Sequence, residues 1–351
     1  MKNVLDIVTS PWAIVPEKLV ELQNIYINHM RGEKIDLAAI EAKLGRSLDN
    51  RERSYDVNNG VAIIYVDGVI GKRMNAFSRI SGGVSSQLIA RDLRGALANP
   101  EVNSILLYVD SPGGAVDGTQ ELAREIFKAR GQKPLAAFTD GLMASAAYWI
   151  ASAADPGRVF ISGNTTQVGS IGVVARHVDV SKMEERWGIK TSEITAGRYK
   201  RIASQYEPLS ESGRRTIQDQ VDHIYSAFVN DVASFRGLSP EPVKEGRGEG
   251  IPWADGRIFL GTQAVNTGLV DGIATLDELI VKLGDARLST RDKVERKIFG
   301  SIAAEEENLP LEKRAERKWN HSPKIRAEFR MGGLKGYLAL CRREGRVIEE
   351  R

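Results

Sequence analysis

The sequence has 351 residues, 42% hydrophobic and 27% charged with 34 glycines, which is the composition of an ordinary soluble globular protein. No stretch approaches 18 consecutive apolar residues, and the first residues lack the uninterrupted apolar run of a secretory signal. We therefore expect no membrane anchor and a cytoplasmic location. The only cysteine, Cys341, excludes an intrachain disulfide and a cysteine-based metal cluster.

Charge is unevenly distributed along the chain. Residues 287–351 hold 17 Lys and Arg against 11 Asp and Glu, a net charge of +6, which leaves −3 for residues 1–286. Such a basic tail could contact nucleic acid or an acidic protein surface, but mixed charge on solvated helices is the more common cause of this pattern.

The N-terminal 55 residues have a helical pattern. Apolar residues recur at three- and four-residue spacing in VPEKLVELQNIYINHMRG and in DLAAIEAKLGR, before a polar stretch. Asn58-Asn59-Gly60 then predicts a turn into the core of the protein. We expect residues 1–55 to form a helical N-terminal extension.

Apolar, β-branched runs alternate with helical segments in the central part of the chain. The predicted strands are Val61–Val66, Ser104–Val109, Pro134–Phe138 and Arg158–Ile161, and the predicted helices are Ser85–Ala98, Gly118–Ala129 and Ala144–Ala153. Strands separated by helices of this length pair mainly in parallel, with the helices packed on the sheet. The sequence therefore predicts an α/β core.

The remaining elements are a strand at Lys190–Ile194 and a long helix at Glu211–Phe235. Beyond Leu283 the sequence becomes charged, so we expect a core domain at residues 56–285 and a tail at 286–351, partly helical or disordered. Within that tail, Ile325–Val347 could form a small helical docking element.

A Pro-Gly-Gly turn follows the second predicted strand. In Asp110-Ser111-Pro112-Gly113-Gly114 the two glycines let the backbone turn sharply and can leave N–H groups aimed at a tetrahedral oxyanion. Gly113 and Gly114 are thus candidates for an oxyanion hole. Taken alone, a Pro-Gly-Gly motif is more often just a turn.

Ser145 is the candidate nucleophile, because it stands among alanines where a strand gives way to a helix. Small neighbours let a peptide backbone approach its Oγ, and the local potential at a helix start is positive. An Ala-rich packed helix with a hydrogen-bonded serine would have the same local sequence.

A nucleophilic serine needs a base. Of the four histidines only His177 falls near these motifs, where a structural role is the more common one. A lysine can accept the serine proton when burial lowers the pKa of its ammonium group, and Lys200 follows a glycine turn in this region. Ser170, between two glycines, could orient the lysine amine or could be a bulge residue.

Taken in order, the segments DSPGG, MASAAYWIAS, VGSIGVV, AGRYK and GRIFLGTQAVNTGLVDGIA resemble the signal peptide peptidase A family of serine peptidases. The resemblance covers roughly Gly60 to Leu283. It implies a Clp-protease/crotonase-like fold of repeated ββα units and peptide hydrolysis through an acyl-enzyme without metal or cofactor. By the same resemblance Ser145 is the nucleophile, Lys200 the base and Ser170 its partner, with Gly113 and Gly114 at the oxyanion and Tyr148 and Trp149 in packing roles.

Without an N-terminal anchor, the chain looks like the soluble branch of the family found in phages and prophages, the prohead or minor capsid protein C peptidases. This branch implies a homo-oligomer that processes scaffold or portal-associated proteins during capsid maturation, in the host cytoplasm or within the prohead. The alternatives are a cytoplasmic peptidase that degrades peptides, a crotonase-like acyl-CoA enzyme, and a catalytically idle capsid component.

Overall fold

A computed structural model describes residues 11–21, 55–73, 83–246, 250–285, 311–313, 315, 319 and 333–344. The chain divides into two compact units, Met1–Arg287 and Leu288–Arg351. The finer division into an N-terminal extension, a peptidase domain and a tail stays a prediction. None of the described helices is long and apolar enough to cross a membrane.

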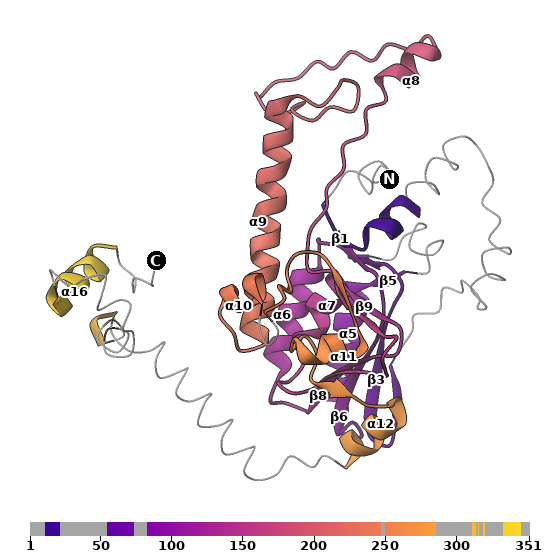
Figure 1. Ribbon diagram of the computed structural model, residues 1–351, viewed down its shortest axis with the longest axis vertical. Coiled ribbons are helices and arrows are strands. Elements are labelled where there is room, and N and C mark those ends of the chain that lie inside the picture. The colour runs from indigo at the N-terminus through magenta and orange to yellow at the C-terminus, as the bar shows by residue number, and fades with distance from the viewer. Residues whose placement is uncertain are drawn as a thin grey trace. The chain divides into compact units, whose positions relative to one another are not determined.

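The core of the first unit is a six-stranded sheet of order β13-β10-β8-β6-β3-β2 (Figure 1). Its strands are β2 (Asp56–Asn58), β3 (Val61–Asp67), β6 (Ser104–Asp110), β8 (Leu135–Thr139), β10 (Val159–Ile161) and β13 (Gly272–Ile273). All neighbours pair in parallel except β2 and β3. The apolar runs form strands here because helices bury both faces of the sheet.

The tight turn between β2 and β3 confirms the predicted entry into the core. Asn59 and Gly60 have φ angles of 50° and 73°, the left-handed pair that a two-residue hairpin turn requires. Asn and Gly tolerate this conformation best, which explains why the dipeptide stands at this point of the sequence.

Helices cover the two faces of the sheet unequally. On one face lie α5 (Ser86–Ala98), α6 (Thr119–Ala129) and α7 (Ala146–Ala151), and on the other lies α12 (Leu276–Gly284). Successive residues of β3 point to opposite faces: Ile63 joins the cluster around α12, and Ile64 joins the large cluster around α5 to α7.

Short strands extend the long ones, so that β6 with β7 (Gly113–Ala115) precedes α6, and β8 with β9 (Leu142–Ala144) precedes α7. This repeated ββα unit confirms the Clp-protease/crotonase-like α/β fold. One further sheet has the order β1-β7-β4-β5, with β1 (Trp12–Ile14), β4 (Ile70–Gly71) and β5 (Val84–Ser85). The other has the order β12-β11-β9, with β11 (Gln167–Gly169) and β12 (Ile258–Leu260).

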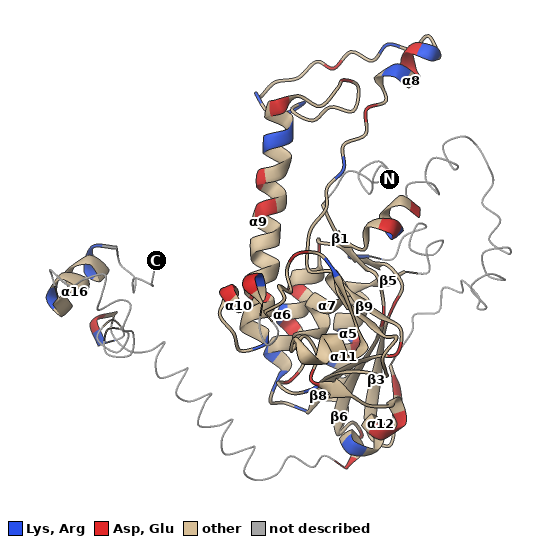
Figure 2. Ribbon diagram, viewed as in Figure 1, with Lys and Arg blue, Asp and Glu red and all other residues tan. Residues whose placement is uncertain are grey.

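An arm, residues 178–224, projects from this core between Val174, which bonds Trp12, and Tyr225, which packs on the core (Figure 1). It consists of an extended segment, α8 (Ser181–Arg186), a loop and the outer part of α9 (Glu211–Phe235), a helix that matches its predicted bounds. Lys and Arg lie among acidic residues along the arm and at its outer end (Figure 2). The predicted strand at Lys190–Ile194 is wrong: this segment is exposed and has no strand beside it to pair with.

The inner end of α9 is fixed to the core through Asp231. Its carboxylate accepts hydrogen bonds from Trp149 Nε1 (3.1 Å), Gln120 Nε2 (2.8 Å) and Arg124 Nη2 (3.0 Å). Phe228 stacks on Trp149 with ring centroids 4.3 Å apart. The helix that carries the arm is therefore tied directly to α7.

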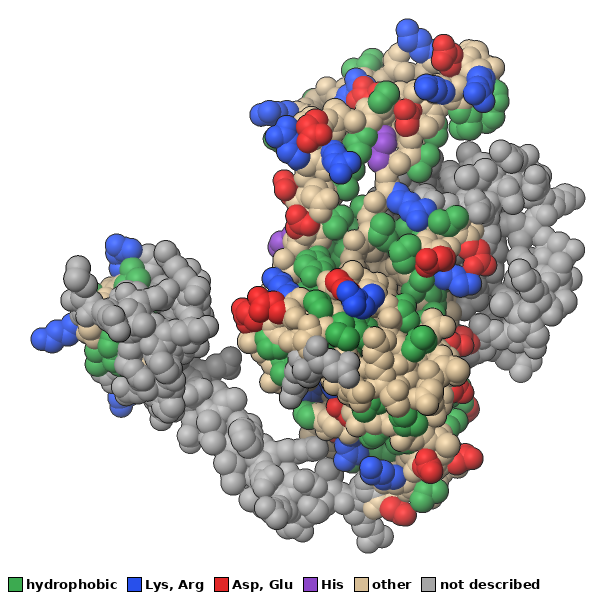
Figure 3. All heavy atoms as spheres, viewed as in Figure 1, with side chains coloured by type: hydrophobic (Ala, Val, Ile, Leu, Met, Phe, Trp, Pro, Cys, Tyr) green, Lys and Arg blue, Asp and Glu red, His purple; other side chains and the backbone are tan. Residues whose placement is uncertain are grey.

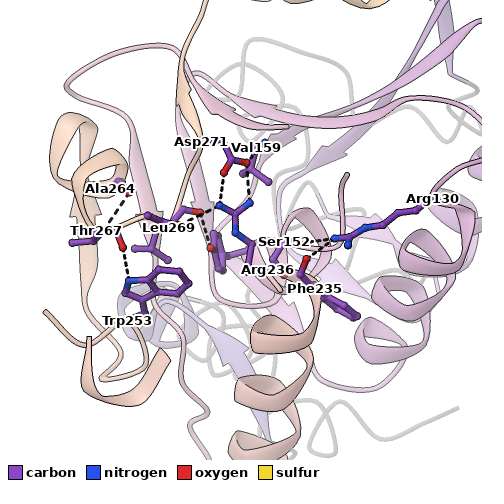
Figure 4. A network of polar contacts seen from close by, with 12 residues as sticks. Arg130, Ser152, Val159, Phe235, Arg236, Trp253, Ala264, Thr267, Leu269 and Asp271 are labelled. Atoms are coloured by element: carbon purple, nitrogen blue, oxygen red, sulfur yellow. Dashed lines mark hydrogen bonds and ion pairs between the residues drawn. The ribbon is translucent and has the colours of Figure 1, made fainter. Parts of the chain in front are cut away.

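Just beyond α9, the buried side chain of Arg236 forms an ion pair with Asp271 at the surface (Figure 4). Its guanidinium donates to both carboxylate oxygens, at 2.6 and 2.8 Å, and to the Gly268 carbonyl at 3.1 Å. Burial pulls the pKa of Arg236 down, but the hydrogen bond to Asp271 and the charge interactions with Tyr148 and Asp271 together outweigh this effect, so the net shift of the pKa is upward. The pair joins the end of α9 to the edge of the central sheet.

The remaining short helices of the first unit are α10 (Pro240–Glu245) and α11 (Gly261–Asn266). Residues 16–21 are helical, as predicted, whereas the rest of the predicted N-terminal helices, residues 22–54, lies outside the described residues. In the second unit α16 (Gly333–Glu344) falls within the predicted segment Ile325–Val347, and its Tyr337 and Cys341 pack with Ala315.

Candidate active site

Ser145 stands at the sharp turn between β9 and α7, as predicted. Its backbone has φ 55° and ψ −117°, an unusual conformation for a residue with a side chain. The turn is held by Ser145 N donating to Gly169 O (2.7 Å) and by Trp149 N donating to Ser145 O (2.9 Å). Such strain costs on the order of 1–3 kcal/mol and concentrates at functional sites.

The hydroxyl of Ser145 is buried, with 1% of the residue exposed, and Oγ has no hydrogen-bond partner within the described part of the chain. An unsatisfied buried hydroxyl costs about 1–3 kcal/mol. It also shows that His177 does not form a serine–histidine pair with Ser145 in this chain. The serine of an Ala-rich structural helix would bond a nearby carbonyl instead.

Ser170 lies beside Ser145 at the end of the neighbouring strand. β9 and β11 pair in parallel with Ala144 opposite Gly169, so the two serines follow equivalent positions of adjacent strands. Ser170 also has a positive φ, 53°, and its N–H donates to Arg257 O at 2.7 Å. Among the described non-glycine residues only Asn59, Ser145 and Ser170 have this conformation.

The predicted oxyanion glycines lie against the same turn. Gly113 has φ 99°, and a Cβ there would stand 3.0 Å from both Ala144 O and Ala146 N, the atoms that flank Ser145. A Cβ at Gly114 would collide with the backbone of Ile70. Glycine is therefore required at both positions, since the obstructing atoms are backbone atoms that cannot move aside.

The N–H of Gly113 is already engaged, because it donates to Ser111 Oγ at 3.2 Å, and this hydroxyl donates in turn to Gly68 O at 2.6 Å. The sequence assigns no role to Ser111, and these two hydrogen bonds show that it fixes the turn. Two further backbone N–H groups lie near Ser145, those of Gly114 and Ala146, the residues that follow Gly113 and Ser145.

Tyr148 and Trp149 pack behind the nucleophile, as expected. The Tyr148 hydroxyl donates to Leu269 O at 2.7 Å, and Trp149 bonds Asp231. Burial raises the pKa of Tyr148, which keeps the phenol protonated. Both rings therefore hold α7, and Ser145 with it, against the rest of the core.

Lys200 is the predicted residue that the structure does not bring to Ser145 within one chain. It lies exposed in the loop before α9, and the neighbouring Ile202 carbonyl lies against Gly213 on the first turns of that helix. Asp231, which bonds Trp149, lies 18 residues after Gly213 along α9. At 1.5 Å per residue this separates the two positions by about 27 Å. Figure 1 shows the loop at the outer end of the arm.

The loop that carries Lys200 also exposes apolar side chains. Ile194 is 99% exposed, Tyr199 60% and Trp187 65%. Figure 3 shows apolar side chains among the charges at the outer end of the arm. Exposed apolar groups of this size, gathered on one projecting element, are typical of a surface that a protein partner covers.

β1 was not predicted, and it lies at the site. It pairs antiparallel with β7, so that Ile14 is opposite Gly113 and Ala13 opposite Gly114. The signal in the sequence is the short apolar run Trp12 to Val15 between Pro11 and Pro16, which favours an extended segment.

Comparison with known proteins finds a family model and several relatives that match this chain. Residues 128–288 match the model of peptidase family S49, a range that includes Ser145, Ser170 and Lys200. The chain is 31% identical over 234 residues to "Capsid assembly protease C" of Escherichia phage lambda, covering 67% of this chain and 51% of that protein. It is 30% identical over 257 residues to "Head-tail preconnector protein GP5" of Enterobacteria phage P21, covering 73% and 49%.

A third relative is "Serine protease SPPA, chloroplastic" of Arabidopsis thaliana, 25% identical over 255 residues, which cover 72% of this chain and 33% of that protein. The chain thus spans about half the length of the two phage relatives that it matches. The match to the S49 model, the α/β fold and the position of Ser145 at a strained turn are consistent with one another. This chain carries a peptidase family S49 domain.

Proposed function

We propose that the protein is a serine endopeptidase in which Ser145 is the nucleophile and Lys200 of a second copy is the general base. The observation that carries this proposal is the strained, buried turn at Ser145, whose hydroxyl has no partner among the described residues. Within an S49 peptidase domain such a hydroxyl is poised for chemistry. The Arabidopsis relative is named a serine protease, which supports a serine nucleophile in this chain.

The position of Lys200 supports a dyad formed between copies. The arm holds this residue too far along α9 to reach Ser145 of its own chain, and the exposed Trp187, Ile194 and Tyr199 beside it favour a contact with another chain. A homo-oligomer in which each arm packs on the next core would bury these side chains. A lysine enclosed in such an interface loses water, which favours its neutral form.

The proposed reaction is peptide hydrolysis through an acyl-enzyme. Neutral Lys200 accepts the Ser145 proton while Oγ attacks the peptide carbonyl, and the N–H groups of Gly114 and Ala146 stabilise the oxyanion. The lysine then gives its proton to the departing amine, and Ser170 orients the lysine amine. A water deprotonated by the same lysine releases the acyl group and restores the serine.

The proposed substrates are proteins of a phage capsid, such as scaffold or portal-associated proteins. The support is the similarity to relatives named for capsid assembly and for a head-tail preconnector. Mass spectrometry after co-expression with the neighbouring capsid genes tests this: the wild type should give defined fragments that Ser145→Ala does not. Identical fragments from both chains would contradict the proposal.

Mixing two inactive variants tests the dyad itself. Ser145→Ala and Lys200→Ala should each be inactive alone, whereas an equal, reassembled mixture should regain about one quarter of wild-type activity, because one interface in four then pairs an intact serine with an intact lysine. A mixture that stays inactive would contradict a dyad between copies. Labelling of the wild type by a fluorophosphonate, lost in Ser145→Ala, reports the nucleophile independently.

A further inference from the structure

β1 lies in a slot with backbone partners on both sides. On one side it pairs with β7, and Val15 N donates to Pro112 O at 2.9 Å. On the other side Trp12 and Val174 exchange two hydrogen bonds, Trp12 N to Val174 O at 2.9 Å and Val174 N to Trp12 O at 2.8 Å. An extended peptide held on both edges in this way is the binding mode of strand addition.

The register brings the Ala13 carbonyl to the donors beside Ser145. Hydrogen-bonded pairs alternate along an antiparallel ladder, so the bond between Val15 and Pro112 assigns the next bonded pair to Ala13 and Gly114. The vacant Cβ position of Gly113 lies 3.0 Å from Ala146 N and closer still to Ala13 O. The Ala13 carbonyl thus lies beside the N–H groups of Gly114 and Ala146 and accepts from the first of them.

The side chains of β1 alternate in the same sense. Ala13 is fully buried in the cluster that contains Ala146 and Ala147 of α7, whereas Trp12 and Ile14 pack on the other side with Leu19 and Val69. β1 therefore contributes only a methyl group to the buried cluster that includes α7. A larger side chain at this position would crowd that cluster.

We propose that β1 is an internal peptide ligand that fills the substrate slot, and that this slot takes an extended peptide with a small residue before the bond that is cut. Substrates bind as a strand between β7 and Val174 once β1 has left. We take the substrate preference of the slot from the residues of β1 that fill it. The substrate residue facing Ser145 is alanine or a similarly small residue, and the residues on either side of it are apolar and face away from Ser145. This inference rests on the proposed peptidase function of Ser145.

Peptide binding without catalysis tests the proposal. The probe is a fluorescein-labelled peptide with the sequence of residues 11–17, Pro-Trp-Ala-Ile-Val-Pro-Glu, titrated with full-length Ser145→Ala and followed by anisotropy. Adding Ala13→Pro removes the N–H that β1 offers to β7 and should release the strand. Since a tethered segment competes at an effective concentration of about 1 mM, the released chain should bind the probe at least tenfold more tightly.

Two further variants show whether a change in probe binding comes from release of β1 or from altered folding. Trp12→Ala truncates the buried indole and should also strengthen probe binding, whereas Val20→Ala truncates an exposed side chain of the same segment and should have no effect. Hydrogen exchange at the Val174 amide, which donates to Trp12 O, should accelerate in Ala13→Pro and in Trp12→Ala. A probe with arginine in place of its alanine should not bind.

The outcomes separate this proposal from the peptidase function. Equal affinity in Ser145→Ala with and without Ala13→Pro, or no binding by either released variant while its circular dichroism matches the parent, would overturn the internal-ligand role of β1. If the released chains bind the probe but a chain with Ser145 intact never cuts any peptide, the slot stands and the peptidase proposal fails. Cleavage that depends on Ser145, with no effect of either β1 variant on probe binding, would support the peptidase and overturn the slot.

Discussion

Asp231→Asn should loosen the joint between α9 and the nucleophile helix. The two carboxylate oxygens of Asp231 have different partners. Oδ2 accepts hydrogen bonds from Trp149 Nε1 and Gln120 Nε2, and Oδ1 accepts one from Arg124. An asparagine of the same shape has only one acceptor oxygen. Whichever way its amide is turned, an NH2 group then faces a donor on one of the two sides.

The expected loss of stability follows from these contacts. Asp231 is buried, with 7% exposed, and hydrogen bonds to a charged group contribute about 1.5–3 kcal/mol each when they are lost. The exposed Arg124 contributes little of this, because solvent screens its ion pair. We expect the free energy of unfolding to fall by about 2 kcal/mol, because the amide oxygen keeps the bonds to Trp149 and Gln120 only as weaker, neutral hydrogen bonds while its NH2 group faces Arg124.

Urea unfolding followed by circular dichroism measures this change. The matched control is Asp222→Asn, an exposed aspartate on the same helix that accepts a hydrogen bond from the exposed Gln218, with an expected effect within about 0.5 kcal/mol. Equal unfolding midpoints for the two variants would refute the view that Asp231 anchors the helix. Peptidase activity of Asp231→Asn should also fall, since Trp149 belongs to α7.

Three further predictions concern single positions. Gly113→Ala should abolish peptidase activity because its Cβ meets backbone beside Ser145, whereas Gly163→Ala, which meets nothing within 4 Å, should retain it; equal activities would contradict the turn geometry. Arg236→Lys should lower the free energy of unfolding in urea by about 2 kcal/mol by replacing a two-point pair with a single ammonium, and an unchanged midpoint would argue against that pair. Trp187→Glu should lower the assembled mass in light scattering together with activity, and a variant of wild-type mass would speak against the arm as an interface.

Much of the core could be predicted because its strands and helices are specified locally. The apolar runs of β3 and β6 and the periodic pattern of α9 each carry enough residues to identify the element. The strand predicted at Lys190–Ile194 is wrong because a strand-like sequence forms a strand only where a neighbouring strand offers hydrogen bonds. On the exposed arm nothing supplies them.

The site could be predicted only in part. Ser145, Ser170 and the two glycines follow from the motifs. The structure gathers them because the two serines follow the paired strands β9 and β11, and Gly113, at the start of β7, lies against the turn at Ser145. The place of Lys200 depends on the length and direction of α9, which a local motif cannot express. β1 was missed because three residues are too few to show a period, and its partners lie about 100 residues further along the chain.

Held at its inner end, α9 acts mechanically as a lever. Because the loop with Lys200 lies about 27 Å from the level of Asp231, a tilt of only 10° about these contacts would move it by about 5 Å, more than the length of a hydrogen bond. Under the proposed dyad between copies, small errors in the fit of one copy on the next would be magnified at Lys200. Catalytic competence of each site would then report on the geometry of the whole assembly.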